Sequence, residues 1–446
     1  MNHSTLVLLL CSSLVPLAAD TPSVLAIRNA RLVTVSGPVI PKGTVVVRDG
    51  LIEAAGASVS PPADAWVIEG EGLTVYPGLI DALSTLGIPA AQASGGPRTT
   101  ITAAPVPPLS IIATATPAPT MPTDTGPNNR SWTRAADLIQ PGDRRLASAR
   151  NAGFTTAVTF PSGGIIAGEG AVINLAGANA AKMVVASPSG LYHSIGGRGG
   201  FGGSFPGSLM GVIAYIRQTY LDADHYREAH ELYRRNPRGT RRPEYDRALQ
   251  GVVDSRRILL PASTAVEIAR MLRFAAELNR SPILYEAHEA YRAADQLRQA
   301  GTPVLVSLRW PERQRDADPE QLDSLRTLEL REKAPSTPAA LAKAGVRFAL
   351  YSGGAERPAD TIRAVKRAID AGLKPEDALR ALTLSAAEIY SVADRLGSIE
   401  PGKIANLIVT DGDLFQERTR VKHIVIDGVK HEPVAEVSAE ERTPIP

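Results

Sequence analysis

Glu286, His288 and Glu289 are the best polar cluster that this sequence offers for proton transfer. They follow the apolar residues 283–285, a short run that is typical of a buried strand. A carboxylate and an imidazole at such a position could act as a general acid–base pair. A histidine at a strand end is also commonly a structural residue held by hydrogen bonds, so both interpretations remain open.

Other histidines are weaker candidates. His193 precedes a glycine-rich run at 196–203 and could reach the same region as His288. His225 and His230 are five residues apart, which keeps them off one another's face on a charged helix. No Lys-Ser or Lys-Thr pair follows the glycine-rich run and no strand immediately precedes it, so it indicates a loop and not a phosphate site.

Residues 72–87 hold the most informative pattern of the chain. Turn residues lead to a Pro-Gly-Leu-Ile-Asp run at 77–81, which predicts a linker entering a buried strand of a parallel sheet. Leu83 and Thr85 follow at the end of this strand. Leucine has no lone pair for a metal ion, and a threonine hydroxyl is a poor ligand beside an imidazole.

This stretch resembles the entry to the first barrel strand of the amidohydrolase superfamily, and the chain is closest to its exported, imidazolonepropionase-like branch. The resemblance extends over roughly residues 24–433, and residues 397–409 are close to the family's ending, with Asn406 where the family usually has Asp. Family members hydrolyse C–N bonds other than peptide bonds with water activated by zinc or another divalent metal. The resemblance therefore implies a hydrolase fold with a metal site at the barrel mouth.

The resemblance also implies where the metal ligands would stand, namely a His-x-His pair on strand one and single ligands on strands five, six and eight. The corresponding residues here are Leu83, Thr85, Pro261, Glu286 and Gly353. A shift of two residues would put His288 in the place of Glu286. One carboxylate and one imidazole are still fewer than the three protein ligands that a catalytic zinc site keeps. We therefore expect a degenerate site with no metal cofactor.

The elements that position these residues alternate between short apolar strands and amphipathic helices from about residue 131 onward. That rhythm predicts a (β/α)8 TIM barrel, with one continuous helical stretch expected at 209–247. Both chain ends show only strand patterns and predict a small β-sandwich. The expected parts are a signal peptide at 1–19, the two sandwich halves at 20–75 and 395–446, and the barrel at 76–394 with a Pro/Ala/Thr-rich loop at 88–130.

Composition limits the classes of partner. The net charge of the 446 residues is +2, and no long basic block suggests nucleic acid or an anionic membrane. The apolar residues 6–10 and the small residues before Asp20 indicate an export signal that is too short to span a bilayer. Cys11 is the single cysteine, so cleavage after Ala19 would leave none, which suits a periplasmic or secreted protein.

Three functional hypotheses follow. The chain could be a non-catalytic homologue that serves as a partner subunit of an intact amidohydrolase paralogue, within a homo- or hetero-oligomer. It could be an active hydrolase with an altered site around Glu286 and His288. It could also be a periplasmic protein that binds a small molecule in the barrel mouth. Metal content after purification separates the second hypothesis from the other two.

Overall fold

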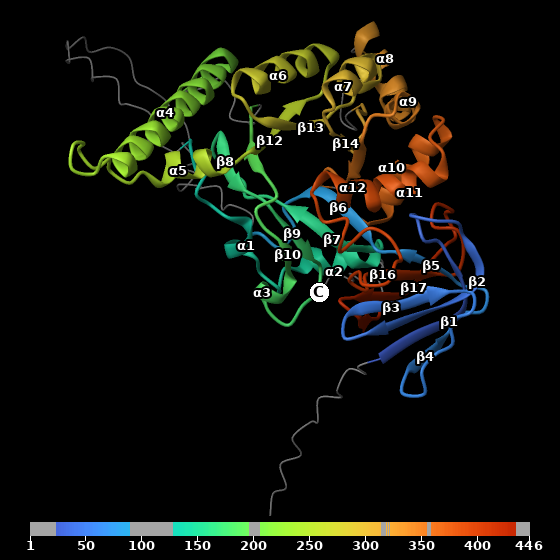
Figure 1. The fold of residues 1–446 in the computed structure, drawn as a ribbon. Helices are drawn as coiled ribbons and strands as arrows, with labels where there is room; N and C mark the ends of the chain where they lie inside the picture. The colour runs from blue at the N-terminus through green and yellow to red at the C-terminus, as the bar shows by residue number, and fades with distance from the viewer. Residues whose placement is uncertain are drawn as a thin grey trace, which may run out of the picture.

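A β domain and a barrel surrounded by helices make up the computed structural model (Figure 1). The structure describes residues 24–89, 128–195, 206–313, 318, 320, 322–354 and 358–433. The expected signal peptide, most of the 88–130 loop and the glycine-rich run at 196–203 lie outside the described residues. Within those residues, no helix is long and apolar enough to cross a membrane.

The β domain joins the two ends of the chain in one sheet. Its strands are β1 (Val24–Leu32), β2 (Ile40–Arg48), β3 (Leu51–Gly56), β4 (Trp66–Glu69), β5 (Thr74–Pro77), β16 (Leu407–Thr410), β17 (Val421–Ile426) and β18 (Val429–His431). Strand β5 pairs antiparallel with β16, with Pro77 opposite Leu407. Asp49 and Gly50, both with positive φ, make the turn between β2 and β3. The prediction that both chain ends build one β domain is confirmed.

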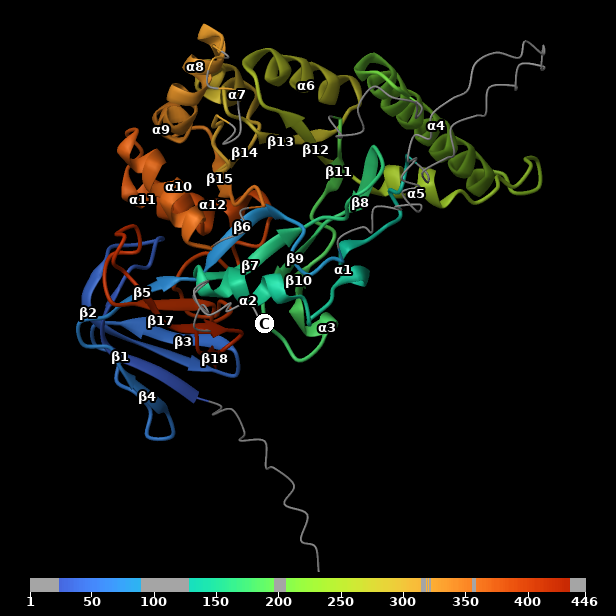
Figure 2. The same cartoon turned by 180° about the vertical axis from the view of Figure 1, so that it is seen from behind.

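The barrel strands pair mainly in parallel. They are β6 (Leu79–Ser84), β7 (Phe154–Thr159), β11 (Leu191–His193), β12 (Arg257–Ala262), β13 (Ser281–Glu286), β14 (Val304–Ser307) and β15 (Phe348–Tyr351). Strands β11 to β15 pair in parallel, and β6 pairs in parallel with β7. Seen from behind, these strands form an arc with helices on its outer side (Figure 2). The barrel prediction is confirmed.

One segment departs from the regular strand–helix alternation. Strands β8 (Ile166–Glu169), β9 (Ala171–Asn174) and β10 (Val184–Ala186) lie between β7 and β11. Strand β9 pairs antiparallel with β7, whereas β8 pairs antiparallel with β11. Gly170 separates the two and packs so closely on Phe160 that an added Cβ would lie 2.2 Å from its ring. A tight bend at this glycine lets consecutive strands join different sheets.

The helices cover the outer face of the barrel. They are α1 (Ala135–Leu138), α2 (Arg144–Asn151), α3 (Ala180–Met183), α4 (Leu209–Arg235), α5 (Arg247–Asp254), α6 (Ala265–Glu277), α7 (Ala294–Ala300), α8 (Leu325–Lys333), α9 (Thr337–Ala344), α10 (Pro358–Asp370), α11 (Pro375–Ala381) and α12 (Leu384–Ile389). The expected continuous helix at 209–247 is wrong, because residues 236–246 separate α4 from α5. This segment contains Pro237 and Pro243, which cannot supply helical N–H groups.

The barrel interior is filled by apolar side chains that alternate along the strands. The buried members of this interior cluster include Ile80, Ala82, Val158, Leu259, Ile283, Leu305 and Ala349. A layer of aromatic rings lies in the same cluster, in which Tyr192 stacks on Tyr285 with ring centroids 5.2 Å apart. The barrel is therefore a packed core, and any ligand site must lie above this layer.

Candidate functional site

A cavity of about 760 Å³ lies at the carboxyl ends of the barrel strands. Strands β6, β13, β14 and β15, or the residues that directly follow them, contribute to its wall, together with helix α2. Its aromatic lining comes from Phe154, Phe160, Tyr192, Tyr285 and Tyr351. This is the end of the fold at which TIM barrels place their sites.

Four of the five positions implied by the family resemblance line this cavity. They are Leu83, Thr85, Glu286 and Gly353. Pro261 does not line it. It lies inside strand β12, where it stands opposite Tyr285 in the parallel register. The sequence motifs thus lead to one cavity on strands one, six and eight, but not on strand five.

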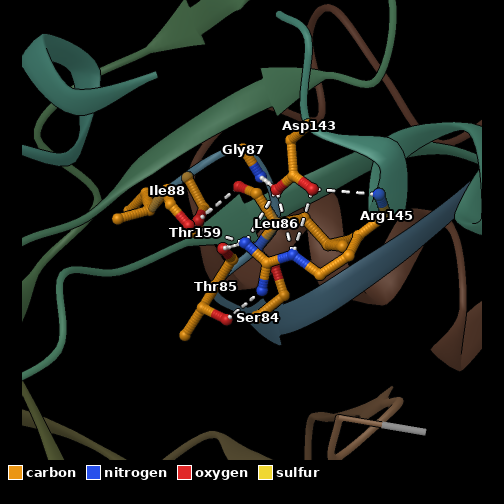
Figure 3. A network of polar contacts seen from close by, with 8 residues as sticks. All are labelled: Ser84, Thr85, Leu86, Gly87, Ile88, Asp143, Arg145 and Thr159. Carbon is orange, nitrogen blue, oxygen red and sulfur yellow. Dashed lines mark hydrogen bonds and ion pairs between the residues drawn. The ribbon is translucent and has the colours of Figure 1, made fainter. Parts of the chain in front are cut away.

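The strand-one positions hold no imidazole, and their side chains are engaged elsewhere. Leu83 is only 8% exposed and packs with the interior cluster. The Thr85 hydroxyl accepts a hydrogen bond of 3.1 Å from Nη1 of Arg145 on helix α2 (Figure 3). A guanidinium group, which carries a full positive charge, therefore contacts the residue that stands in place of the family's second ligand.

Arg145 ties the turn after strand β6 to helix α2. Its Nη2 donates to the carbonyl oxygens of Thr85 at 2.9 Å and Ile88 at 2.6 Å, and also to Asp143 Oδ2 at 2.7 Å (Figure 3). Asp143 in turn accepts from the backbone N–H of Gly87 and caps helix α2. Burial acts to raise the pKa of Asp143, but the hydrogen bonds and charge of Arg145 outweigh it and leave this pKa lowered. Asp143 is thus held as a carboxylate within this network.

Glu286 ends strand β13 with an unusual backbone. Its φ is 75°, and that of the next residue, Ala287, is 47°. Both lie in the left-handed region, which is costly for residues with a Cβ and persists where the surrounding structure enforces it. Burial raises the pKa of Glu286, and the nearby carboxylate of Glu267 adds to this shift. The half-buried acid therefore meets a like charge in its surroundings.

His288 also lines the cavity, but protein groups surround it. Its Nδ1 lies 3.3 Å from the Ser263 hydroxyl, and its carbonyl oxygen accepts from the Thr337 hydroxyl at 2.7 Å. Burial lowers its pKa, although carbonyl groups of Arg309 and Ser307 oppose the shift. The imidazole is therefore held mainly in its neutral form. Glu289, by contrast, is buried and accepts from the backbone N–H of Ala265 at the start of helix α6.

Gly353 occupies the strand-eight position with a φ of 65°. A Cβ added there would lie 2.7 Å from Ser307 Oγ and 3.0 Å from the Cβ of Arg309. The family's aspartate would therefore need both a left-handed backbone and space that strand β14 now fills. This position cannot accept the missing ligand without movement of its neighbours.

His193 is not part of the cavity wall. It is fully buried, with Nε2 3.2 Å from the Tyr220 hydroxyl and Nδ1 3.2 Å from the Leu191 carbonyl oxygen. Burial lowers its pKa to about 4. The expectation that it could reach the barrel mouth is wrong, since its ring packs against helix α4.

Asp81 and Ser352 form a polar pair that the sequence reasoning missed. The backbone N–H and the hydroxyl of Ser352 donate to the Asp81 carboxylate at 2.9 and 2.6 Å. This pair joins strand β6 to the end of β15 and so closes the barrel. Burial raises the pKa of Asp81 to about 6, although the bonds from Ser352 and a Leu83 backbone bond act against the shift. The available signal was a lone acid within an apolar strand.

The donor set of the cavity does not suit a divalent metal ion. Across the described ranges, no three His, Cys, Asp or Glu side chains come together as a potential metal site. The side chains at Leu83 and Gly353 carry no ligand atom. The Thr85 hydroxyl accepts a hydrogen bond from the Arg145 guanidinium group. The residues present therefore do not fit the metal that the fold family implies.

Comparison with known proteins agrees with this fold. The sequence pattern of the Amidohydrolase family matches residues 265–434. An amidohydrolase from Thermotoga maritima MSB8 is 25% identical, with a TM-score of 0.72 over 91% of this chain and 99% of its own. A prolidase solved with N-methylphosphonate-L-proline shares the fold at 17% identity, with a TM-score of 0.54 over 92% of this chain and 100% of its own.

Curated relatives match over a much shorter stretch. Adenine deaminase 1 of Desulfotalea psychrophila is 38% identical over 64 residues, which is 14% of this chain and 10% of that enzyme. The adenine deaminase of Moorella thermoacetica is 39% identical over 64 residues, with the same two shares. The match thus spans about a tenth of these relatives' length. The family pattern and the Thermotoga structure, which agrees over nearly its full length, show that this chain belongs to the amidohydrolase superfamily.

Proposed function

We propose that this chain has lost the metal site of its superfamily and acts as a non-catalytic homologue, as a partner subunit or a binding protein. The supporting observation is the cavity at the strand ends, where four of the family's ligand positions meet without a set of metal ligands. Glu286 and His288 are the remaining candidates, and they are fewer than the three protein ligands of a catalytic zinc site.

The neighbouring contacts support the same proposal. Arg145 donates to Thr85 at the strand-one end of the cavity, so this hydroxyl is already engaged by a guanidinium group. The space at Gly353 is occupied by Ser307 and Arg309. Loss of the metal is therefore accompanied by contacts that fill or neutralise the vacated positions.

The first test measures metal and turnover together. The purified full chain should contain far less than one equivalent of zinc, iron or manganese in elemental analysis. When zinc is added, the protein should not compete with a chelator for it. It should not hydrolyse a panel of amide and N-acyl amino acid substrates, with or without added metal. About one tightly bound metal per chain would overturn the proposal. Turnover that survives chelation and disappears in Glu286→Gln would instead support an altered hydrolytic site.

A second candidate function is the binding of a small molecule in the cavity. Its volume of about 760 Å³ is within the range of ordinary ligand sites. Aromatic rings, aliphatic side chains and polar groups line it, and such a mixture can both bury and orient a ligand. This candidate is compatible with a partner role, since a ligand-bound barrel can still associate with another subunit.

A further inference from the structure

We propose that the cavity binds a small organic ammonium ion, with the Glu286 carboxylate as its counter-ion. This inference rests on the second candidate function and adds the chemical class of the ligand. It is argued from the charges, the hydrogen-bond acceptors and the backbone around Glu286.

The charge around Glu286 favours a cation. Glu286 is half-buried in the cavity wall, and the charged side chain that shifts its pKa is another carboxylate, Glu267. A partly buried carboxylate beside a like charge is stabilised when a cation binds next to it. Among the described residues, no cation contributes to the pKa shift of Glu286.

The two arginines of the wall do not contradict this assignment. Arg145 already contacts the Asp143 carboxylate and three further oxygen atoms. Arg309 is exposed, so water screens its charge. Among the described residues, no ion pair joins either arginine to Glu286.

The hydroxyl groups nearby offer acceptors. The Tyr285 hydroxyl donates a hydrogen bond to the His193 carbonyl oxygen at 2.8 Å. The Ser352 hydroxyl donates a hydrogen bond to the Asp81 carboxylate at 2.6 Å. Each oxygen also takes part in a second hydrogen bond, Ser352 with the backbone N–H of Gly354 and Tyr285 with the Tyr192 hydroxyl. A hydroxyl oxygen has two lone pairs, so one on each group is left to accept from a ligand. An ammonium group is a donor without acceptor capacity, so it matches this wall better than a carboxylate or a phosphate would.

The apolar part of the wall sets the body of the ligand. Leu83, Phe160 and Tyr192 lie in the cavity wall and in the interior cluster. Aromatic faces attract cations as well as apolar groups. The positive φ of Glu286 and Ala287 adds a separate observation, because strained backbone of this kind concentrates at ligand sites. An aryl- or alkyl-substituted ammonium ion combines these requirements.

The test uses three probes of similar shape and different charge. Binding of benzylamine, benzyl alcohol and phenylacetate to the full chain is measured by isothermal titration calorimetry at neutral pH. We expect benzylamine, which is protonated, to bind at least tenfold more tightly than benzyl alcohol, and phenylacetate to bind no better than the alcohol. Tighter binding of phenylacetate would overturn the proposal, and so would absence of binding across methylamine, benzylamine and phenethylamine.

Variants identify the counter-ion. Glu286→Gln should weaken benzylamine binding about ten- to a hundredfold, as expected when a charge-assisted hydrogen bond is lost. Glu286→Gly should show the same loss and fold readily, because glycine accepts the positive φ. Glu277→Gln is the matched control, since Glu277 is exposed and pairs with Arg217. Unchanged affinity in both Glu286 variants would contradict the assignment. A metal-free chain that binds no amine would overturn this inference alone and leave the loss of the metal site standing.

Discussion

Asp81 carries its charge at a position where the barrel interior disfavours it. Its ordinary pKa of 3.8 rises to about 6, with burial as the largest cause. The folded chain therefore binds a proton at Asp81 more tightly than the unfolded chain does. It follows that the contribution of this group to stability is fully present below about pH 4 and is lost as the pH rises through about 6.

Replacing Asp81 with Asn should remove this pH dependence. The free energy of unfolding of the parent, relative to Asp81→Asn, should fall by roughly 2 kcal/mol between pH 4 and pH 7. Urea unfolding of both proteins at the two pH values measures this difference. A difference that stays constant across this range would show that the Asp81 carboxyl is not perturbed by folding.

Individual site residues could be predicted from the sequence where a motif gave their position. They could not be predicted where the contact joins residues that are far apart in the sequence. The motifs around Leu83, Glu286 and Gly353 lead to one cavity. Asp81 and Ser352 were missed because 271 positions separate them, and no local pattern shows that they meet. His193 was misplaced because its neighbour Tyr220 lies on a helix whose packing direction the sequence does not reveal.

Helix α2 and strand β6 are joined by Arg145, whose bonds hold the turn beside the cavity. Removing this side chain with Arg145→Ala should lower the free energy of unfolding by about 1–2 kcal/mol, because the carbonyl groups of Thr85 and Ile88 lose a charged donor. Hydrogen exchange in residues 84–88 should become faster. Arg144→Ala is the control, since Arg144 is exposed on the same helix. Equal exchange in the two variants would contradict the role given to Arg145.

Elements with a strong local pattern were predicted well, and irregular ones were not. The apolar run at 283–285 predicted strand β13, because a buried parallel strand appears in the sequence as a short apolar segment. The antiparallel departure at β8 and β9 depends on Gly170, whose close contact with Phe160 becomes visible only in three dimensions. The break between α4 and α5 shows a different failure, since the charged pattern continued across two prolines that interrupt the helix.

At the scale of the whole molecule, Asn406 connects the β domain to the barrel. Its Nδ2 donates to Thr156 Oγ1 at 3.0 Å and to Asn174 Oδ1 at 2.7 Å, and its Oδ1 accepts from the backbone N–H of Asp427 at 2.9 Å. The sequence comparison singled out this residue because the family usually has Asp there. The structure gives it a role as a buried bridge between the two parts.

Asn406→Ala should therefore destabilise the whole chain. We expect a loss of about 2–4 kcal/mol in the free energy of unfolding, since buried partners are left without hydrogen bonds. A double-mutant cycle with Asn174→Ala, measured by urea unfolding, isolates the bridge from other effects. A coupling energy near zero would mean that Asn406 acts only within the β domain.

The pairing of β5 with β16 also constrains the order of events during synthesis. Strands β5 and β16 lie side by side (Figure 1). The Thr410 hydroxyl donates to the Thr74 carbonyl oxygen, although 336 positions separate the two residues. At about 5–20 residues per second, roughly 17 to 67 seconds pass between the emergence of these strands from the ribosome. Strand β5 therefore has no partner on its β16 side while the barrel is translated. The N-terminal part of the β domain can complete its sheet only after the C-terminal strands have been synthesised.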